Sequence, residues 1–213
     1  MNNKQTYLIS KRVMDVLLSS TGLAIFFPLL LIIAVVIRFR LGPPILFRQV
    51  RPGLNCQPFI LYKFRTMTDQ YDENGILFAD SRRLTKLGNF LRRTSLDELP
   101  ELFNVVKGDM SLVGPRPLLM RYVPYYTEKE NIRHSVRPGI TGLAQISGRN
   151  HLCWDERLEM DIKYVEQKSV LIDLKILFKT IISVIKREGV VDAPDTMMLN
   201  LDQERSFKRV DRF

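Results

Sequence analysis

A continuous segment without charged residues, Val16 to Ile37, constrains the fold of this chain more than any other feature. As a straight helix, these 22 residues would cross the hydrocarbon core of a bilayer, at about 1.5 Å per residue. Pro28 lies near the middle of the segment, where it removes a backbone hydrogen-bond donor and favours a kink or a break. Each half would then be too short to cross the membrane by itself.

Basic residues flank this segment on both sides: Lys11, Arg12, Arg38 and Arg40. Cytoplasmic flanks of membrane segments are enriched in Lys and Arg, so two basic flanks favour both ends on the cytoplasmic side. We therefore expect residues 1–40 to form a re-entrant membrane hairpin of helix, break and helix, with the break at Pro28. A straight spanning helix and a cleaved signal peptide are the alternatives. The signal peptide is disfavoured because the apolar run is long and no small-residue cleavage site follows it.

The remaining residues suffice for one modest core. The chain has 213 residues, of which 46% are apolar, and this composition fits one core plus a membrane segment. A formal net charge of +9 suits an anionic partner, but charge alone does not choose among lipid headgroups, phosphates and nucleic acid. Cys56 and Cys153 lie far apart and lack the spacing of a disulfide framework or zinc site, so a reducing, cytosolic environment is the simpler interpretation.

Sequence patterns predict short strands at Ile45 to Phe47 and Phe59 to Phe64, and helical periodicity from Leu84 to Val106. Frequent Pro and Gly make the rest rich in loops. A second apolar stretch, Val170 to Ile185, carries lysines on one helical face and predicts an amphipathic helix. Packing on the core and burial in the headgroup layer both remain open for this helix.

These elements predict an α+β, mainly helical fold. It comprises the membrane hairpin (1–40), a small loop-rich domain with short strands (41–189), and a loosely ordered C-terminal tail (190–213). The resemblance described below implies that the amphipathic helices are membrane-surface helices.

Two adjacent carboxylates, Asp97 and Glu98, are the strongest candidates for catalytic residues. Ser95 and Glu98 have the spacing of a capping box, and Asp97 could itself cap, so both acids are expected at a helix N-terminus. The helix dipole and the guanidinium of Arg92 would favour the ionised form of Asp97, which could attack phosphorus or bind a metal ion. Alternatively, the acids only cap a helix and pair with surface arginines.

Candidate phosphate ligands surround this pair in the sequence. Arginines held by a proline-stiffened backbone, such as Arg116 between two prolines, lose less entropy when they bind a phosphate. The alternative for each is a solvated surface charge. The candidates are Lys63, Arg65, Arg92, Arg116, Arg137 and Arg149.

Long motifs connect these residues to a known family. From Lys11 to about Gly189, the sequence resembles the small monotopic phosphoglycosyl transferases, often called bacterial sugar transferases. The matching motifs are K-R-V-M-D, the proline within the apolar run, Y-K-F-R-T-M, S-L-D-E-L-P-E-L-F-N-V, G-D-M-S-L-V-G-P-R-P, R-P-G-I-T-G-L-A-Q and G-R-N. One residue departs from the family pattern: Phe27 stands where a serine usually precedes the proline.

The resemblance implies a magnesium-dependent ping-pong reaction in a cytoplasmic phosphoglycosyl transferase domain at 41–189. Asp97 would be the nucleophile and Glu98 its metal-binding partner, and both would contact Mg²⁺. The reaction would move a sugar 1-phosphate from a UDP-sugar to polyprenyl (undecaprenyl) phosphate, through a covalent aspartyl-phosphosugar and with release of UMP. This would be the first membrane step in assembling a capsule, exopolysaccharide, O-antigen or glycoprotein glycan.

The family also implies a place in the cell. The chain would be a monotopic protein among the phospholipids of the bacterial cytoplasmic (inner) membrane, with its catalytic domain facing the cytoplasm. A homodimer is left open, and no nucleic acid is expected as a partner. The rival hypothesis is a non-catalytic, basic, membrane-anchored scaffold, which would leave the Asp97 and Glu98 pair unexplained.

Overall fold

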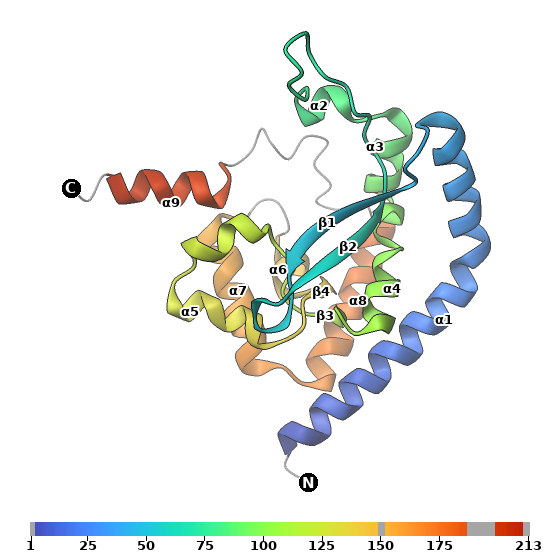
Figure 1. Ribbon diagram of the computed structural model, residues 1–213. Coiled ribbons are helices and arrows are strands. Elements are labelled where there is room, and N and C mark those ends of the chain that lie inside the picture. The colour runs from blue at the N-terminus through green and yellow to red at the C-terminus, as the bar shows by residue number, and fades with distance from the viewer. Residues whose placement is uncertain (1–2, 149–151, 187–198, 211–213) are drawn as a thin grey trace.

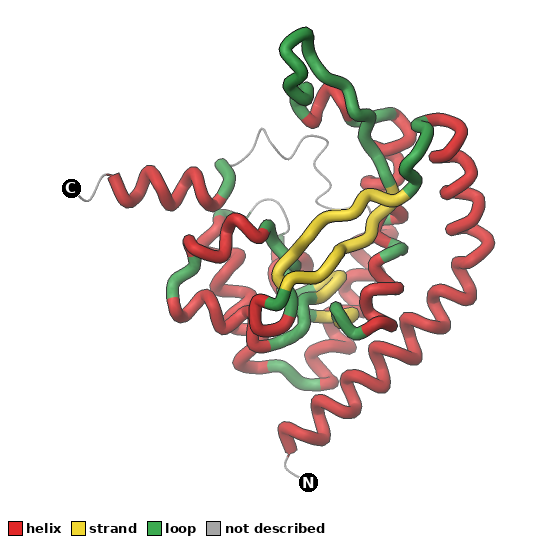
Figure 2. The backbone as a smooth tube through the Cα atoms, in the orientation of Figure 1, coloured by secondary structure: helices red, strands yellow, loops and turns green. Residues whose placement is uncertain are grey.

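The computed structural model describes residues 3–148, 152–186 and 199–210. Helices form most of the regular structure and the strands are short, which confirms the mainly helical prediction (Figures 1 and 2). The α-helices are α1 (Asn3–Arg40), α2 (Asp80–Arg83), α3 (Lys86–Arg93), α4 (Glu101–Lys107), α5 (Glu128–Asn131), α6 (Leu143–Ser147), α7 (Trp154–Gln167), α8 (Val170–Lys186) and α9 (Leu201–Val210). The strands are β1 (Leu46–Pro52), β2 (Pro58–Phe64), β3 (Ser111–Val113) and β4 (Gly139–Thr141). Short 3-10 helices are η1 (Leu54–Cys56), η2 (Leu96–Glu98), η3 (Met120–Tyr125) and η4 (Ile132–Ser135).

The N-terminal helix α1 continues through Pro28. The expected interruption into two arms is therefore not seen, and Figure 1 shows one curved helix along the side of the molecule. A proline removes one hydrogen bond of the helical ladder and allows such bending without ending the helix.

Most of α1 has no protein to pack against. The segment from Gln5 to Arg40 is long and apolar enough to cross a membrane. Only 11% of its most apolar 18-residue stretch is buried. Large apolar side chains such as Ile25, Phe27 and Phe39 are exposed. A core helix of a soluble protein would be mostly buried, so these features indicate a membrane-anchored protein.

The other face of α1 contacts the compact domain along both halves. In the first half, Arg12 donates hydrogen bonds to the carbonyls of Val105 (2.7 Å) and Val106 (2.9 Å), the last turn of α4. The Asp15 carboxylate accepts a hydrogen bond from the backbone N–H of Leu112 (3.0 Å). These bonds satisfy helix-end carbonyls and a strand N–H that would otherwise lack partners.

In the second half of α1, apolar packing replaces these polar contacts. Ile33 and Ile37 are buried in one cluster with Phe64 of β2 and Leu91 of α3. Both halves of α1 are thus attached to the same domain.

Two small sheets organise that domain. β1 and β2 pair antiparallel, with Leu46 opposite Phe64 and Pro52 opposite Pro58. The strand expected at 59–64 is confirmed, whereas the one expected at 45–47 extends to Pro52. β3 and β4 pair in parallel and lie within the main core.

The second apolar stretch forms α8, and its two faces differ. Ile176 and Asp173 are buried against the domain, and the Asp173 carboxylate accepts hydrogen bonds from Tyr7 and Tyr164. On the outer face, Leu171 and Phe178 are 77% and 66% exposed. One face of α8 thus packs on the core while the other presents apolar side chains outward.

Part of the expected C-terminal tail is ordered. Residues 201–210 form α9, and Leu201 is fully buried against η3 and α7. This corrects the expectation of a loosely ordered tail for these residues, because a sequence of mixed charge gives little sign of a docked helix. The boundary placed at 189 lies outside the described residues.

Candidate active site

The segment carrying Asp97 and Glu98 lies between two α-helices, within the region of predicted helical periodicity from Leu84 to Val106. α3 ends at Arg93 and α4 begins at Glu101, with the short η2 between them. Pro100 at the start of α4 explains the interruption, since its missing N–H and its ring exclude it from a helix interior.

The expected capping box is also wrong. Ser95 has a φ of 55°, in the left-handed region, and its side chain caps nothing. The two carboxylates therefore sit within a single 3-10 turn, and not at the N-terminus of a long helix.

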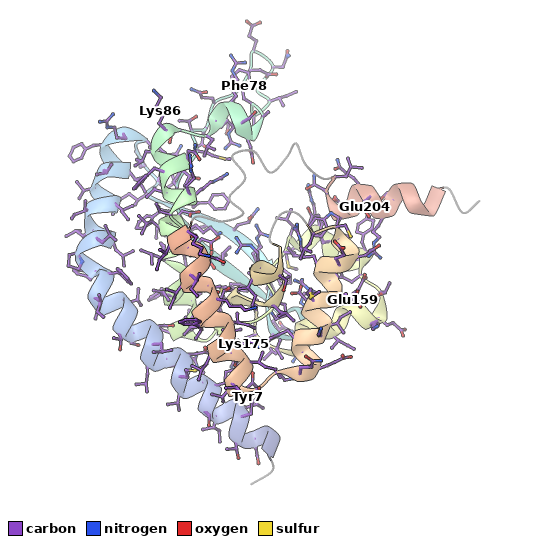
Figure 3. All side chains as sticks on the ribbon, turned by 180° about the vertical axis from the view of Figure 1, so that it is seen from behind. Tyr7, Phe78, Lys86, Glu159, Lys175 and Glu204 are labelled. Atoms are coloured by element: carbon purple, nitrogen blue, oxygen red, sulfur yellow. The ribbon has the colours of Figure 1, made fainter. Side chains whose placement is uncertain are left out.

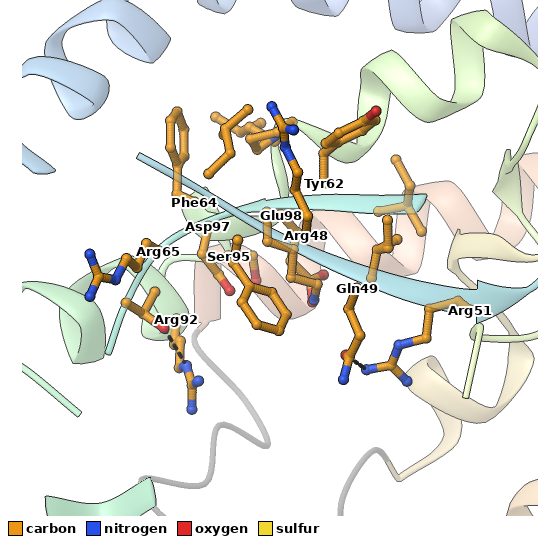
Figure 4. A pocket seen from close by; sticks show the side chains of 18 of the residues that line it. Arg48, Gln49, Arg51, Tyr62, Phe64, Arg65, Arg92, Ser95, Asp97 and Glu98 are labelled. Carbon is orange, nitrogen blue, oxygen red and sulfur yellow. Dashed lines mark hydrogen bonds and ion pairs between the residues drawn. The ribbon is translucent and has the colours of Figure 1, made fainter. Parts of the chain in front are cut away.

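Asp97 and Glu98 line a large groove of about 2120 Å³. Figure 4 draws both carboxylates in this pocket together with Arg92 and Arg51. At one side the lining includes apolar residues of α1, such as Leu23 and Phe27. The groove thus joins the membrane-anchoring helix to the paired acids.

Glu98 is held by two cations. Its Oε1 accepts hydrogen bonds from Lys63 Nζ at 2.6 Å and from Arg116 Nη2 at 2.5 Å. Burial raises the pKa of Glu98, but Arg116 and Lys63 lower it by more, so its pKa lies well below the usual range. Glu98 is therefore a carboxylate at any physiological pH, and two predicted phosphate ligands, Lys63 and Arg116, meet at it.

Asp97 has a different environment. Its side chain is 7% exposed and, within the described part of the chain, accepts no hydrogen bond and forms no ion pair. Burial and the charge of Glu98 raise its pKa to about 6, although Lys63, Arg92 and Arg116 act in the opposite direction. The expectation of a lowered pKa is thus wrong. Desolvation outweighs Arg92, and no long helix supplies the expected dipole.

A third acid, Glu101, was missed by the sequence reasoning. It is 2% exposed, and its Oε1 lies 3.1 Å from Lys63 Nζ. Burial and Glu98 raise its pKa to about 7. Its position four residues after Asp97 was a usable signal, because residues i and i+4 share a helical face.

The other predicted phosphate ligands divide by location. Arg92 lines the groove, and its Nε donates to Thr66 Oγ1 at 3.1 Å (Figure 4). Arg65 also lines the groove, but its guanidinium donates to the carbonyls of Pro43 and Met67 and to Asp69.

The last two candidates are not brought to the groove. Arg137 donates to the carbonyl of Gly108 at 2.8 Å and is not among the groove-lining residues. Arg149 lies outside the described residues.

Arg51 is a further groove residue that the sequence did not single out. It donates to Gln49 Oε1 at 2.5 Å and to the carbonyl of Pro117 at 3.1 Å (Figure 4). Burial and Arg116 lower its pKa to about 10, so it remains cationic at neutral pH. Its place in the R-P-G corner (Arg51 to Gly53) was the available sequence signal.

This arrangement suits phosphorylated substrates. The Asp97 carboxylate, which bonds to none of the described side chains, lines a groove whose cations include Lys63, Arg92 and Arg116. Guanidinium and ammonium groups bind phosphoryl oxygens, and a nearby carboxylate can act as a nucleophile. With the apolar α1 at the same groove, the site is typical of a membrane-associated enzyme that handles phosphate groups.

Comparison with known proteins identifies the family. A family model described as bacterial sugar transferase matches residues 6–187. The sugar transferase EpsL of Bacillus subtilis, called uncharacterized in its name, is 52% identical over 188 residues, covering 86% of this chain and 91% of its own length. The chain belongs to the bacterial sugar transferase family and is a phosphoglycosyl transferase. This supports the enzyme over the basic scaffold.

Two further relatives are longer proteins. The UDP-glucose:undecaprenyl-phosphate glucose-1-phosphate transferase of Klebsiella pneumoniae is 40% identical over 189 residues, covering 82% of this chain and 40% of the relative. The UDP-N-acetylgalactosamine-undecaprenyl-phosphate N-acetylgalactosaminephosphotransferase of Aeromonas hydrophila is 38% identical over 195 residues, covering 86% of this chain and 45% of the relative. The chain thus spans less than half the length of either.

Proposed function

We propose that this chain transfers a sugar 1-phosphate from a UDP-sugar to polyprenyl phosphate and releases UMP. The proposal rests mainly on the carboxylate of Asp97, which has no hydrogen-bond or ion-pair partner among the described residues and lines a cationic groove that also reaches the apolar α1. The names of the Klebsiella and Aeromonas relatives contain both substrate classes and support the same reaction here.

The reaction has two balanced steps at Asp97. First, a carboxylate oxygen of Asp97 attacks the β-phosphorus of the UDP-sugar. The bond from this phosphorus to the bridging oxygen breaks, and UMP leaves with that oxygen. Second, a phosphate oxygen of the polyprenyl phosphate attacks the same phosphorus, the bond to Asp97 breaks, and polyprenyl-diphosphate-sugar forms. Covalent catalysis lets a soluble and a lipid substrate react at one carboxylate in turn.

The cations around Glu98 support this chemistry. Lys63 and Arg116 are fixed by Glu98, so they are already oriented when the diphosphate enters. Preorganised donors stabilise the charge that develops on the transferring phosphoryl group and on departing UMP. Glu101 holds Lys63 from its other side.

The donor set fits a magnesium ion. Within the described residues no cluster of three or more ligating side chains occurs, but magnesium usually needs only one or two carboxylates together with substrate phosphates. Asp97 and Glu98 would hold it, and no described residue occupies the Asp97 oxygens with a hydrogen bond or ion pair. When bound, magnesium would neutralise part of the diphosphate charge.

The packing of α1 supports a monotopic, re-entrant placement. Arg12 and Ile37, near its two ends, both contact the same compact domain, which must lie on one side of the membrane. A straight spanning helix would carry one of these residues to the opposite side, away from its partners. The basic flanks favour the cytoplasm as that side, and polyprenyl phosphate would enter from the surrounding phospholipids.

The biological step follows from the product. A polyprenyl-diphosphate-sugar is the first lipid-linked intermediate of a bacterial glycoconjugate, such as a capsule, exopolysaccharide, O-antigen or glycoprotein glycan. Relatives of similar identity are named for different sugars, so the proposal specifies the donor as a UDP-sugar and its test uses a panel.

The test is a product assay on the purified full chain in detergent, with magnesium and undecaprenyl phosphate. UDP-glucose, UDP-galactose and the two UDP-N-acetylhexosamines serve as donors, and Asp97→Asn serves as the inactive control. We expect at least one donor to give UMP and lipid-linked diphosphate sugar in equal amounts. Release of UDP in place of UMP, or equal UMP release by Asp97→Asn, would refute the proposal.

A further inference from the structure

The segment from Leu199 to Arg205, which we call the C-terminal strap, lies beyond the residues that match the family model. Its attachment is partly apolar. Leu201 is fully buried in a cluster with Tyr122 of η3 and Trp154 of α7. The carbonyl of Leu199 also accepts a hydrogen bond from Trp154 Nε1 at 2.8 Å. Removal of the Leu201 side chain from water therefore favours the docked position of the strap.

Charged contacts fix the rest of the strap. Arg205 donates to Glu130 Oε1 of α5 and to Asp155 Oδ1 of α7, each at 2.7 Å. Asp202 Oδ2 lies 3.3 Å from Arg121 Nε of η3. The strap thus joins α5, α7 and η3, and is an integral part of the domain surface.

Asn200 of the strap faces the groove that contains Asp97. The Tyr122 hydroxyl donates to Asn200 Oδ1 at 2.8 Å, and Asn200 Nδ2 lies 3.2 Å from Gln203 Oε1. These two contacts orient the side-chain amide. Because an amide nitrogen has two N–H groups, one remains for a ligand. Arg121, which Asp202 holds, lines the same groove.

The strap and the membrane helix both line the groove. Leu23, Phe27 and Leu30 contribute apolar side chains from α1, and Asn200 contributes a polar side chain from the strap. Figure 1 shows α1 and α9 on opposite sides of the molecule, and Figure 3 repeats this from behind, with Tyr7 on α1 and Glu204 on α9. An apolar lining at the membrane suits a prenyl chain, so the polar lining suits the water-soluble substrate.

We propose that the C-terminal strap forms the wall of the nucleotide-sugar end of the groove and that Asn200 is a donor-binding residue. Its amide N–H donates a hydrogen bond to an oxygen of the nucleotide sugar, and Asp202 holds Arg121 toward the same ligand. The strap takes no part in binding the lipid acceptor. This inference rests on the proposed transfer reaction, because it assigns one of that reaction's two substrates to the strap.

Three substitutions in the full-length chain test the assignment. Asn200→Asp keeps an oxygen for the Tyr122 hydroxyl but removes the amide donor and adds a charge that repels an anionic ligand. Leu201→Asp detaches the strap. Asn74→Asp is the matched control, because it makes the same amide-to-carboxylate change at an exposed position outside both the strap and the groove lining. In a ping-pong reaction, kcat/KM for each substrate reports only its own half-reaction, so the two ends of the groove can be measured separately.

We expect Asn200→Asp and Leu201→Asp to lower kcat/KM for the UDP-sugar about tenfold or more, as for a lost substrate hydrogen bond. The value for undecaprenyl phosphate should stay within about twofold of wild type, since that end of the groove is untouched. If kcat/KM fell equally for both substrates, the strap would have only a structural role. An unchanged kcat/KM for the UDP-sugar in Asn200→Asp would refute the binding role of Asn200. Failure of the wild-type chain to release UMP would instead count against the proposed function.

Discussion

Three carboxylates within five positions of one short segment have different protonation behaviour. Glu98 keeps a low pKa because Lys63 and Arg116 both bond to it, whereas burial raises the pKa of Asp97 and Glu101. The motif pointed to Asp97 and Glu98 from the sequence alone. Their desolvation could not be predicted, because it depends on distant segments such as β2 covering them. Glu101 had a sequence signal in its spacing from Asp97, but its raised pKa likewise depends on burial by the fold.

The raised pKa of Asp97 predicts an acid limb in the pH profile. Protonated Asp97 is a poor nucleophile, so kcat/KM for the UDP-sugar should fall roughly tenfold per pH unit below a pH near 6. Lys63 lowers this pKa, so Lys63→Met should move the limb to higher pH at the same magnesium concentration. Initial rates between pH 4.5 and 8 measure this shift. Lys175→Met, on the exposed face of α8, is the control and should leave the limb in place. A limb that stays fixed or moves to lower pH in Lys63→Met would contradict the assignment.

At the scale of secondary-structure elements, the sequence predicted whether a segment is a helix or a strand better than it predicted where each element begins and ends. The β2 strand and the helical character of 84–106 were predicted by periodicity. The helix start at Pro100 and the left-handed backbone of Ser95 were not predicted, because the residue pattern also fits a helix capped by Ser95 or Asp97. For α1, the predicted break at Pro28 is a curvature, because contacts with the domain along both halves hold the helix together.

Because α3 lies very close to the backbone that follows β2, we expect a side chain at Gly88 to destabilise the fold strongly. A Cβ at this position would lie 1.9 Å from the carbonyl oxygen of Thr66, a backbone atom that cannot move aside freely. Gly88→Ala should therefore lower the free energy of unfolding by about 2 kcal/mol or more and disturb the contact between Arg92 and Thr66. Gly22→Ala is the matched control, since its Cβ would make an ordinary 3.4 Å contact with Leu102. Denaturant unfolding in detergent measures both; similar stability of the two variants would contradict this packing.

The attachment of both halves of α1 predicts its membrane topology. In a chain with Cys56 and Cys153 replaced by serine, new cysteines at Gln5 and Asn74 should both react with a membrane-impermeant label from the cytoplasmic side only. Pro28→Ala should straighten the helix and shift part of the molecules toward labelling of position 5 from the other side. Phe27→Ser, which restores the usual family residue, should keep the same-side pattern. Opposite-side labelling in the parent chain would rule out the re-entrant placement.

At the scale of the whole molecule, one groove connects the membrane helix with the C-terminal strap. Sequence motifs identified the central residues of this groove, from Lys63 to Arg116, because these residues lie in long motifs shared with the family. They could not identify Arg51 or Asn200 as groove residues, since only the tertiary fold brings β1 and the strap to the acids. In the proposed reaction, this groove would give a lipid and a soluble substrate access to the same carboxylate at different times.

The most direct test of this account follows the covalent phosphosugar through one complete cycle. The purified chain is incubated with magnesium and an active UDP-sugar without acceptor, and intact-protein and peptide mass spectrometry are recorded before and after adding undecaprenyl phosphate. We predict a phosphosugar adduct on the peptide containing Asp97, its loss when the lipid is added, and its absence in Asp97→Asn, which should fold normally. An adduct that persists after lipid addition, or substantial turnover by Asp97→Asn, would contradict the account.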